Sequence, residues 1–208
     1  MKNQGCKFCR LAAGERPLGV VDQPFMESEN FLAIPSLGSF IEGWTLIIPR
    51  RHVLSLSKFY SDEEFLDFSK SVAERVESLF GKIIFFEHGP SEHNSLTGCG
   101  IDHAHLHLVP LDGSLAEVMR RDLEIAWTPS DGKELAERTA SQDYLFYSES
   151  GPRAAFSGLV GRARQPVSQY FRRKLAEVTQ QPEDFDYKLT PLIEQSVKSG
   201  HALSGSSR

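Results

Sequence analysis

The sequence predicts an α+β protein, built on an antiparallel sheet of about five strands with helices on one face and a helical C-terminal extension. Short apolar runs of strand length, bounded by turn-forming residues, recur through the first half of the chain. A segment with helical periodicity separates the first two runs from the next two. No helical segment connects the last two runs, so they are expected to pair antiparallel across a loop.

The first two strands are predicted at residues 31–34, FLAI, and residues 45–49, TLIIP. Asn30 and Pro35 bound the first run, and Pro49 ends the second, because proline cannot donate a hydrogen bond to a neighbouring strand. The short intervening loop PSLGSFIEG favours an antiparallel pair.

Residues 61–80 are predicted to form a helix with one buried face. Apolar residues recur there at spacings of three and four, which is the helical period. Ser61 and Glu64 match a capping box at the start of the helix, and Gly81 is suited to end it. The residues of the apolar face are Phe65, Phe68, Val72, Val76 and Leu79.

The next strands, KIIFFEHG at 82–89 and HAHLHLV at 103–109, are joined by a polar loop. Side chains alternate in a strand, so His103, His105 and His107 share one face while the apolar residues between them face a core. An ordinary polar strand face has no need of imidazole. Imidazole can attack phosphorus, donate hydrogen bonds to phosphate oxygens or bind zinc, so this strand indicates catalysis or metal binding.

The chain divides into residues 1–111, an extension at 112–198 that is expected to pack on them, and a loose, polar tail at 199–208. Helices are predicted in SLAEVMRRD and at 167–179, an edge strand in DYLFYS, and a Gly/Pro-rich loop between that strand and the second helix. The arginines in and before the second helix are expected to be solvated rather than to bind phosphate. They are Arg162, Arg164, Arg172 and Arg173.

The amino-acid composition excludes several classes of function. The 208 residues carry a net charge of −5, which argues against a nucleic-acid partner, because such binding needs a basic surface. No apolar run approaches the ~20 residues of a membrane span, and the N-terminus lacks the apolar segment of a signal peptide. The three cysteines do not form a disulfide framework. A cytoplasmic protein with no membrane partner is the simplest interpretation.

The segment HAHLHLV resembles the motif of the histidine triad (HIT) superfamily, in which three histidines alternate with hydrophobic residues. Three further segments resemble the family: CKFCRLAAGERP near the N-terminus, EGWTLIIPRRH, and IIFFEHGP at the end of a strand. The resemblance covers about residues 6–111 and implies a HIT-like fold.

The resemblance implies a nucleotide hydrolase or nucleotidyltransferase that acts on a small-molecule nucleotide. His105, the middle histidine, would attack the α-phosphate and form a covalent nucleotidyl-histidine. His107 would orient His105 through its backbone carbonyl and help to hold phosphate. Proteins of this branch are often homodimers, and a homodimer is therefore expected.

A lone Cys6-x-x-Cys9 pair fits a redox pair, half a zinc site, or no site at all in a frayed terminus. Zinc requires four nitrogen or sulfur ligands. The arrangement resembles that of zinc-bearing HIT proteins, which implies a structural Zn²⁺ held by Cys6, Cys9, His52 and His103. Residues 1–111 would then be a catalytic domain that includes an N-terminal zinc-binding segment.

The sequence departs from the family pattern around the expected substrate. Ser36 stands where an acidic residue commonly contacts ribose, and Trp44 stands where a histidine is common. Gly100 replaces a serine or threonine that assists the leaving group, and the Asn-x-Gly segment becomes EHG, with His88 in its centre. Ser36, His88 and Gly100 are therefore the candidates for contact with substrate phosphate.

Three alternatives stay open at this point. The chain could bind a nucleotide or phosphate without turnover, or it could be a zinc-stabilised interaction module in which His105 has no role. It could also act on nucleic-acid ends, although the acidic net charge opposes this.

Overall fold

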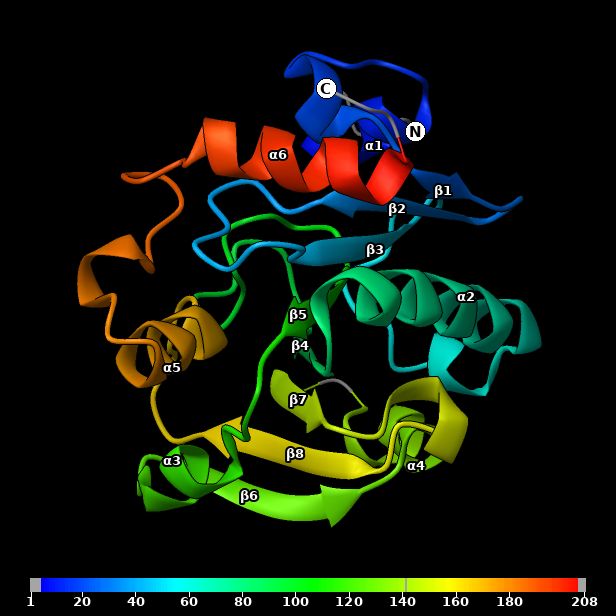
Figure 1. The fold of residues 1–208 in the computed structure, drawn as a ribbon. Coiled ribbons are helices and arrows are strands. Elements are labelled where there is room, and N and C mark those ends of the chain that lie inside the picture. Colours follow the sequence, from blue (N-terminus) through cyan, green and yellow to red (C-terminus); the bar gives the residue numbers. More distant parts are fainter. Residues whose placement is uncertain (1–4, 141, 206–208) are drawn as a thin grey trace.

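The computed structural model describes residues 5–140 and 142–205, and these form one antiparallel sheet of eight strands flanked by helices (Figure 1). The α+β class is confirmed, but the predicted number of about five strands is wrong. The strand order is β1-β2-β3-β5-β4-β7-β8-β6. The strands are β1 Met26–Glu27, β2 Phe31–Pro35, β3 Thr45–Pro49, β4 Ile83–Gly89, β5 Leu106–Pro110, β6 Ile125–Ser130, β7 Tyr144–Ser148 and β8 Gly158–Ala163.

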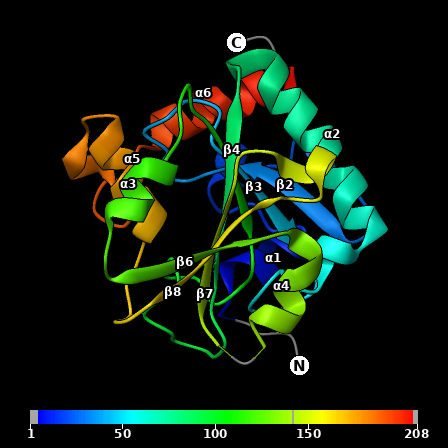
Figure 2. The ribbon, with the colours of Figure 1, turned by 90° about the horizontal axis from the view of Figure 1, so that it is seen from below.

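Helices cover both faces of the sheet, rather than the one face that was predicted (Figure 2). Residues of α2 and α4 pack with one core, and residues of α1, α3 and α5 pack with the other. Among the described residues, no helix is both long and apolar enough to cross a membrane. The helices are α1 Lys7–Ala12, α2 Glu63–Phe80, α3 Ala116–Arg121, α4 Gly132–Arg138, α5 Tyr170–Val178 and α6 Ile193–Ser204.

The first half of the sheet pairs as the sequence predicts. Strands β2 and β3 are antiparallel, with Phe31 opposite Pro49. Strands β4 and β5 also pair antiparallel, with Ile83 opposite Pro110. Helix α2 connects β3 to β4, so that β5 lies between these two strands. The histidine-bearing segment therefore leads into a strand with a neighbour on each side.

Helix α2 begins one residue later than the predicted capping box. Its N-cap is Asp62, whose carboxylate accepts a hydrogen bond from the Phe65 N–H at 2.9 Å. The prediction of a capping box formed by Ser61 and Glu64 is wrong, because the Glu64 carboxylate instead accepts a hydrogen bond from the Ser28 hydroxyl at 2.6 Å. A carboxylate directly before the first turn is an effective N-cap, so the hydroxyl of Ser61 is not needed.

The C-terminal extension adds three strands to the sheet, and this is the main departure from a helical extension. Strand β7 pairs with both β4 and β8, so it is not an edge strand. Strand β8 occupies the predicted Gly/Pro-rich loop. Its glycines are needed for close packing, because a Cβ on Gly161 would lie 2.6 Å from the Trp127 ring. Glycines are common in loops, and for that reason the sequence suggested a loop here. A strand that packs closely against neighbouring side chains also requires glycine.

The predicted loose tail is also wrong for most of its described part, because α6 extends to Ser204. Small residues let this helix lie close to the segment after β2. The Ser199 hydroxyl accepts a hydrogen bond from the Gly43 N–H at 3.0 Å, and the Ser196 hydroxyl donates one to the Ser36 carbonyl at 2.9 Å. The small polar residues that suggested a loose tail therefore form a closely packed helix face. Residues 206–208 lie outside the described residues.

Candidate active site and metal cluster

The three histidines of the triad are buried around the start of β5. His103 and His105 lie in the segment just before the strand, and His107 lies in the strand itself. Their exposed fractions are 1%, 4% and 4%, so their face of the sheet is covered rather than open to solvent. The alternating Ala104 and Leu106 pack in the opposite core with residues of α2.

His105 is fixed by its neighbours at both ring nitrogens. Its Nδ1 lies 2.8 Å from the carbonyl oxygen of His103, which can only accept, so Nδ1 carries a proton. Its Nε2 lies 2.9 Å from the Cys99 sulfur. The prediction that the His107 carbonyl orients His105 is wrong, because the chain bends before β5 and brings the His103 carbonyl under the ring.

Cys99 and His105 favour each other's charged forms. Burial lowers the pKa of His105, but the charge of the Cys99 sulfur and its hydrogen bond offset this, and the net shift is upward. Burial raises the pKa of Cys99, but the charge of His105 offsets it, and the net shift is downward. Both shifts favour an imidazolium–thiolate pair, in which the proton resides on His105 Nε2 and the Cys99 sulfur accepts its hydrogen bond.

His107 is oriented by Trp44, the residue that replaces a histidine of the family pattern. The Trp44 Nε1–H donates to His107 Nδ1 at 3.0 Å. Burial, followed by the charge of His105, lowers the pKa of His107 well below its ordinary value, so the ring is neutral. Its proton then resides on Nε2, which has no hydrogen-bond partner among the described residues. This nitrogen is therefore a buried donor without an acceptor among the described residues.

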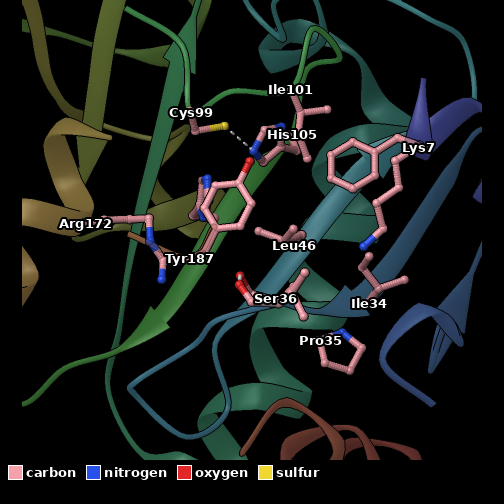
Figure 3. Close-up of a pocket in the computed structure, with 13 residues that line it drawn as sticks. Lys7, Ile34, Pro35, Ser36, Leu46, Cys99, Ile101, His105, Arg172 and Tyr187 are labelled. Atoms are coloured by element: carbon pink, nitrogen blue, oxygen red, sulfur yellow. Dashed lines mark hydrogen bonds between the residues drawn. The ribbon is translucent and has the colours of Figure 1, made fainter. Parts of the chain in front are cut away.

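A cavity opens beside His105 and His107 (Figure 3). Its empty volume is about 510 Å³, part of it open to solvent, which is in the range of small-molecule sites. Apolar side chains from three elements line one side, among them Phe8, Ile34 and Leu46. Ser36 also lines the cavity, whereas Gly100 lines a neighbouring groove.

The C-terminal extension reaches this cavity through Arg172 and Tyr187 (Figure 3). Arg172 is only 2% exposed, so the expectation that it is a solvated helix residue is wrong. Its guanidinium donates to the carbonyls of Phe185, at 2.6 Å, and Gly38, and lies 4.6 Å from the Trp44 ring centroid. Its carbonyl partners and the flat ring satisfy the guanidinium in a buried position.

His88 does not line the cavity. Its ring packs against Phe171, with centroids 5.2 Å apart, and neither ring nitrogen has a partner among the described residues. Burial, with the charges of His105 and Arg172, lowers the pKa of His88 to about 3, so the ring is neutral. Ligand atoms of His88, Cys99 and His107 lie within 4.8 Å of one another.

Glu87, the neighbour of His88 on β4, points to the other side of the sheet. Its carboxylate accepts hydrogen bonds from the Leu56 N–H at 2.6 Å, the Tyr60 hydroxyl at 3.0 Å and the Tyr144 hydroxyl at 2.8 Å. Burial raises the pKa of Glu87 to about 7 in spite of these donors. Glu87 is thus a core carboxyl group rather than a substrate contact.

The raised pKa of Glu87 predicts a pH-dependent stability. The folded protein binds this proton more tightly than the unfolded chain does. Its stabilising effect is therefore complete below the ordinary pKa of 4.5 and is lost as the pH rises to about 7. In the wild type, this effect lowers the free energy of unfolding by up to about 3 kcal/mol as the pH rises from 4.5 to about 7. Glu87→Gln should remove this decrease. Urea unfolding from pH 4.5 to 8 measures it, with the exposed Glu92→Gln as control. Equal slopes in both variants would contradict the prediction.

Four potential metal ligands meet where α1 lies against the histidine segment. Cys6 Sγ lies 3.3 Å from His103 Nδ1, and Cys9 Sγ lies 3.3 Å from His52 Nδ1 and 3.6 Å from His103 Nδ1. All four ligand atoms lie within 4.8 Å of one another. Residues separated by about half the chain thus come together as the resemblance implied.

The chemistry of this donor set fits a tetrahedral metal ion. Zinc–sulfur and zinc–nitrogen bonds of ~2.3 and ~2.0–2.1 Å place tetrahedral ligands ~3.4–3.8 Å apart, close to the distances between these atoms. His103 Nε2 lies 2.8 Å from the Pro49 carbonyl, so it carries the proton and leaves Nδ1 free toward the cysteines. Burial lowers the pKa of His103 to about 4, which keeps the ring neutral, as a ligand must be.

Sequence reasoning missed Arg172, Tyr187 and Lys188. A signal for Arg172 was present, because it shares a helix face with the buried Leu175 and Ala176. Tyr187 and Lys188 follow the end of α5 in an irregular segment, where periodicity carries no information.

The chain is similar to several proteins that are described as HIT-like. No protein-family model matches the chain. An uncharacterized HIT-like protein of Methanocaldococcus jannaschii is 30% identical over 116 residues, which cover 55% of this chain and 85% of that protein. An uncharacterized HIT-like protein of Mycobacterium tuberculosis is 27% identical over 146 residues, covering 66% of this chain and 95% of that protein. The crystal structure of a HIT-like protein from Bartonella henselae, described as involved in cell-cycle regulation and containing an unknown ligand, has 21% identity and a TM-score of 0.40 over 58% of this chain and 93% of that one.

Proposed function

The chain belongs to the histidine triad superfamily, and from that membership we propose that it is a nucleotide hydrolase or nucleotidyltransferase that cleaves at the α-phosphate of a small-molecule nucleotide. The observation that carries the proposal is the setting of His105. One ring nitrogen is held by the His103 carbonyl at 2.8 Å, and the ring lines a cavity together with His107. A buried imidazole held in one orientation suits nucleophilic attack.

The reaction begins with the proton on His105 Nε2. This proton passes to the Cys99 sulfur, 2.9 Å away, and leaves a lone pair on Nε2. Nε2 attacks the α-phosphorus, a P–N bond forms, and the bond to the leaving group breaks. Water or another acceptor then attacks the same phosphorus and releases the nucleotide from His105. The two displacements replace one more difficult step.

His107 and Arg172 stabilise the negative charge that develops on the phosphate in this step. The ring of His107 lines the cavity, and its Nε2–H would donate to a phosphate oxygen as negative charge builds there. Arg172 lines the same cavity and adds a fixed positive charge, since the pKa of about 10 that burial gives it still leaves it protonated at neutral pH. Donors already held in place need no reorganisation during the reaction. The apolar side chains opposite offer a surface for the nucleobase.

The Cys6, Cys9, His52 and His103 cluster is proposed to hold structural zinc. The ion would tie α1 to the histidine segment and hold the His103 carbonyl against His105 Nδ1. No chemical step passes through it. The homodimer and the cytoplasmic location stay predictions from the sequence.

A trapping experiment tests the proposal. The protein is incubated separately with adenosine 5′-phosphoramidate, ADP-ribose and diadenosine tetraphosphate, quenched in denaturant at alkaline pH, digested and analysed by mass spectrometry. The expected result is an adenylyl group on the peptide that contains His105, which is lost on acid treatment because the P–N bond of a phosphohistidine is acid-labile. Binding of these compounds with neither adduct nor product would instead support a nucleotide-binding protein without turnover.

A further inference from the structure

We propose that Tyr187 and Lys188, from the C-terminal extension, form a leaving-group subsite beside His105 that selects substrates with an anionic phosphate leaving group. The inference rests on the proposed function and assigns the substrate class for it. Tyr187 donates a hydrogen bond to the departing oxygen, and Lys188 neutralises its charge. The preferred substrates are thus nucleotide phosphoanhydrides rather than phosphoramidates.

The first observation is what surrounds Gly100, five residues before His105. A Cβ on Gly100 would lie 2.7 Å from Lys188 Nζ and 3.2 Å from the Tyr187 hydroxyl oxygen. The position has φ +91°, which glycine adopts without strain. The space that a side chain at residue 100 would take is therefore filled by an ammonium and a hydroxyl group from the extension.

The extension is held in this place by close packing on its other side. A Cβ on Gly38 would lie 2.5 Å from Tyr187 Cβ, so the loop after β2 approaches the segment as closely as a glycine permits. Arg172 lies 5.6 Å from the Tyr187 ring centroid and donates to the Phe185 carbonyl at 2.6 Å. These contacts fix the hydroxyl of Tyr187, which points toward His105 (Figure 3).

The second observation is a groove that continues from the cavity on the Gly100 side. It is lined by Gly100 and Lys188, and it shares Lys7 and Ile101 with the cavity of His105. Its empty volume is about 1480 Å³, including space open to solvent. A substrate whose α-phosphate lies at His105 would extend its leaving group into this groove. The groove is large enough for further phosphates and a second nucleoside.

Lys188 supplies the positive charge at the Gly100 end of the groove. Lys7 is already paired with Asp22 at 3.1 Å. The acidic Asp102 also lines the groove, where its carboxylate accepts a hydrogen bond from the Asn94 N–H at 2.8 Å and lies 3.4 Å from His93 Nδ1. The ammonium of Lys188 is thus the groove cation placed closest to Gly100.

The chemistry of the step then depends on the leaving group. As His105 Nε2 forms its bond to phosphorus, the electron pair of the breaking P–O bond moves to the bridging oxygen. Burial, with the charge of Cys99, raises the pKa of Tyr187 to about 12, so this hydroxyl keeps its proton and donates a hydrogen bond. A departing phosphate needs only this donor and the charge of Lys188. A departing amine needs a full proton, which neither group readily gives.

The test compares diadenosine tetraphosphate with adenosine 5′-phosphoramidate in the full-length protein. Lys188→Met should lower kcat/KM for the tetraphosphate by about 10- to 100-fold and for the phosphoramidate by less than about 3-fold. Tyr187→Phe should lower kcat for the tetraphosphate by about 10-fold or more, with a smaller change in KM. The matched control is Leu189→Ala, whose side chain is 82% exposed in the same segment.

The outcomes separate this inference from the proposed function. Equal losses on both substrates, or no loss on the tetraphosphate, would overturn the subsite while leaving His105 chemistry intact. If the wild type turns over neither substrate, the proposed function fails. Calorimetric titration with inorganic pyrophosphate then decides the subsite: weaker binding to Lys188→Met by about 10-fold supports it, and unchanged or absent binding overturns it. Thermal unfolding of each variant shows whether the fold is kept.

Discussion

His105→Asn is expected to lower kcat/KM for nucleotide cleavage by about 10⁴-fold or more and to abolish the covalent nucleotidyl intermediate. The substitution removes the attacking nitrogen. The amide of asparagine stays polar and small enough for the space between Phe8 and His107, whose rings lie 5.2 and 4.8 Å from that of His105. Steady-state and single-turnover kinetics with diadenosine tetraphosphate measure the loss.

Two further variants make this result specific. His107→Phe should cost only about 10²-fold, because it removes one donor to the phosphate but not the nucleophile. His201→Gln, on α6 outside the site, should behave as the wild type. Residual activity of His105→Asn within about 10-fold of the wild type would place the nucleophile elsewhere and contradict the mechanism.

The central part of the site could be predicted from the sequence because its chemistry is local. His105 and His107 are two residues apart in an extended segment, so their common side follows from backbone geometry alone. The four residues of the potential metal cluster were a different case, because Cys6 and His103 are distant in the chain. Only the resemblance to zinc-bearing proteins brought them together, and the 3.3 Å approach of their side chains agrees with it.

The remainder of the site depends on packing that the sequence does not display. Arg172 looked like a solvated helix residue because charged side chains on helices usually are. It is buried because carbonyls of two other segments and the Trp44 ring satisfy its guanidinium. Strand β8 was not predicted for a related reason. Its glycines are typical of a loop, and only the structure shows the side chains that pack closely against them.

Loss of the proposed zinc ion is expected to have the largest effect on the free energy of unfolding. Cys9→Ser should lower the zinc content of the purified protein from about one equivalent to less than a tenth. It should also lower the free energy of unfolding by more than about 4 kcal/mol, because metal–ligand bonds would no longer connect α1 to the histidine segment. Elemental analysis and urea unfolding measure both quantities. Cys99→Ser is the control, because it changes a thiol outside this cluster and should keep the zinc.

The same experiment addresses whether the metal matters to the active site. His103 would serve two groups at once: its Nδ1 faces the cysteines, and its carbonyl oxygen holds His105 Nδ1 at 2.8 Å. Loss of the ion should therefore loosen His105 even where the sheet stays folded, and Cys9→Ser should lose nucleotidyl transfer at temperatures below its unfolding transition. Wild-type protein with less than a tenth of an equivalent of zinc and freely titratable Cys6 and Cys9 would contradict the metal site. Full activity in a zinc-free but folded variant would instead show that the His103 carbonyl keeps its place without the ion.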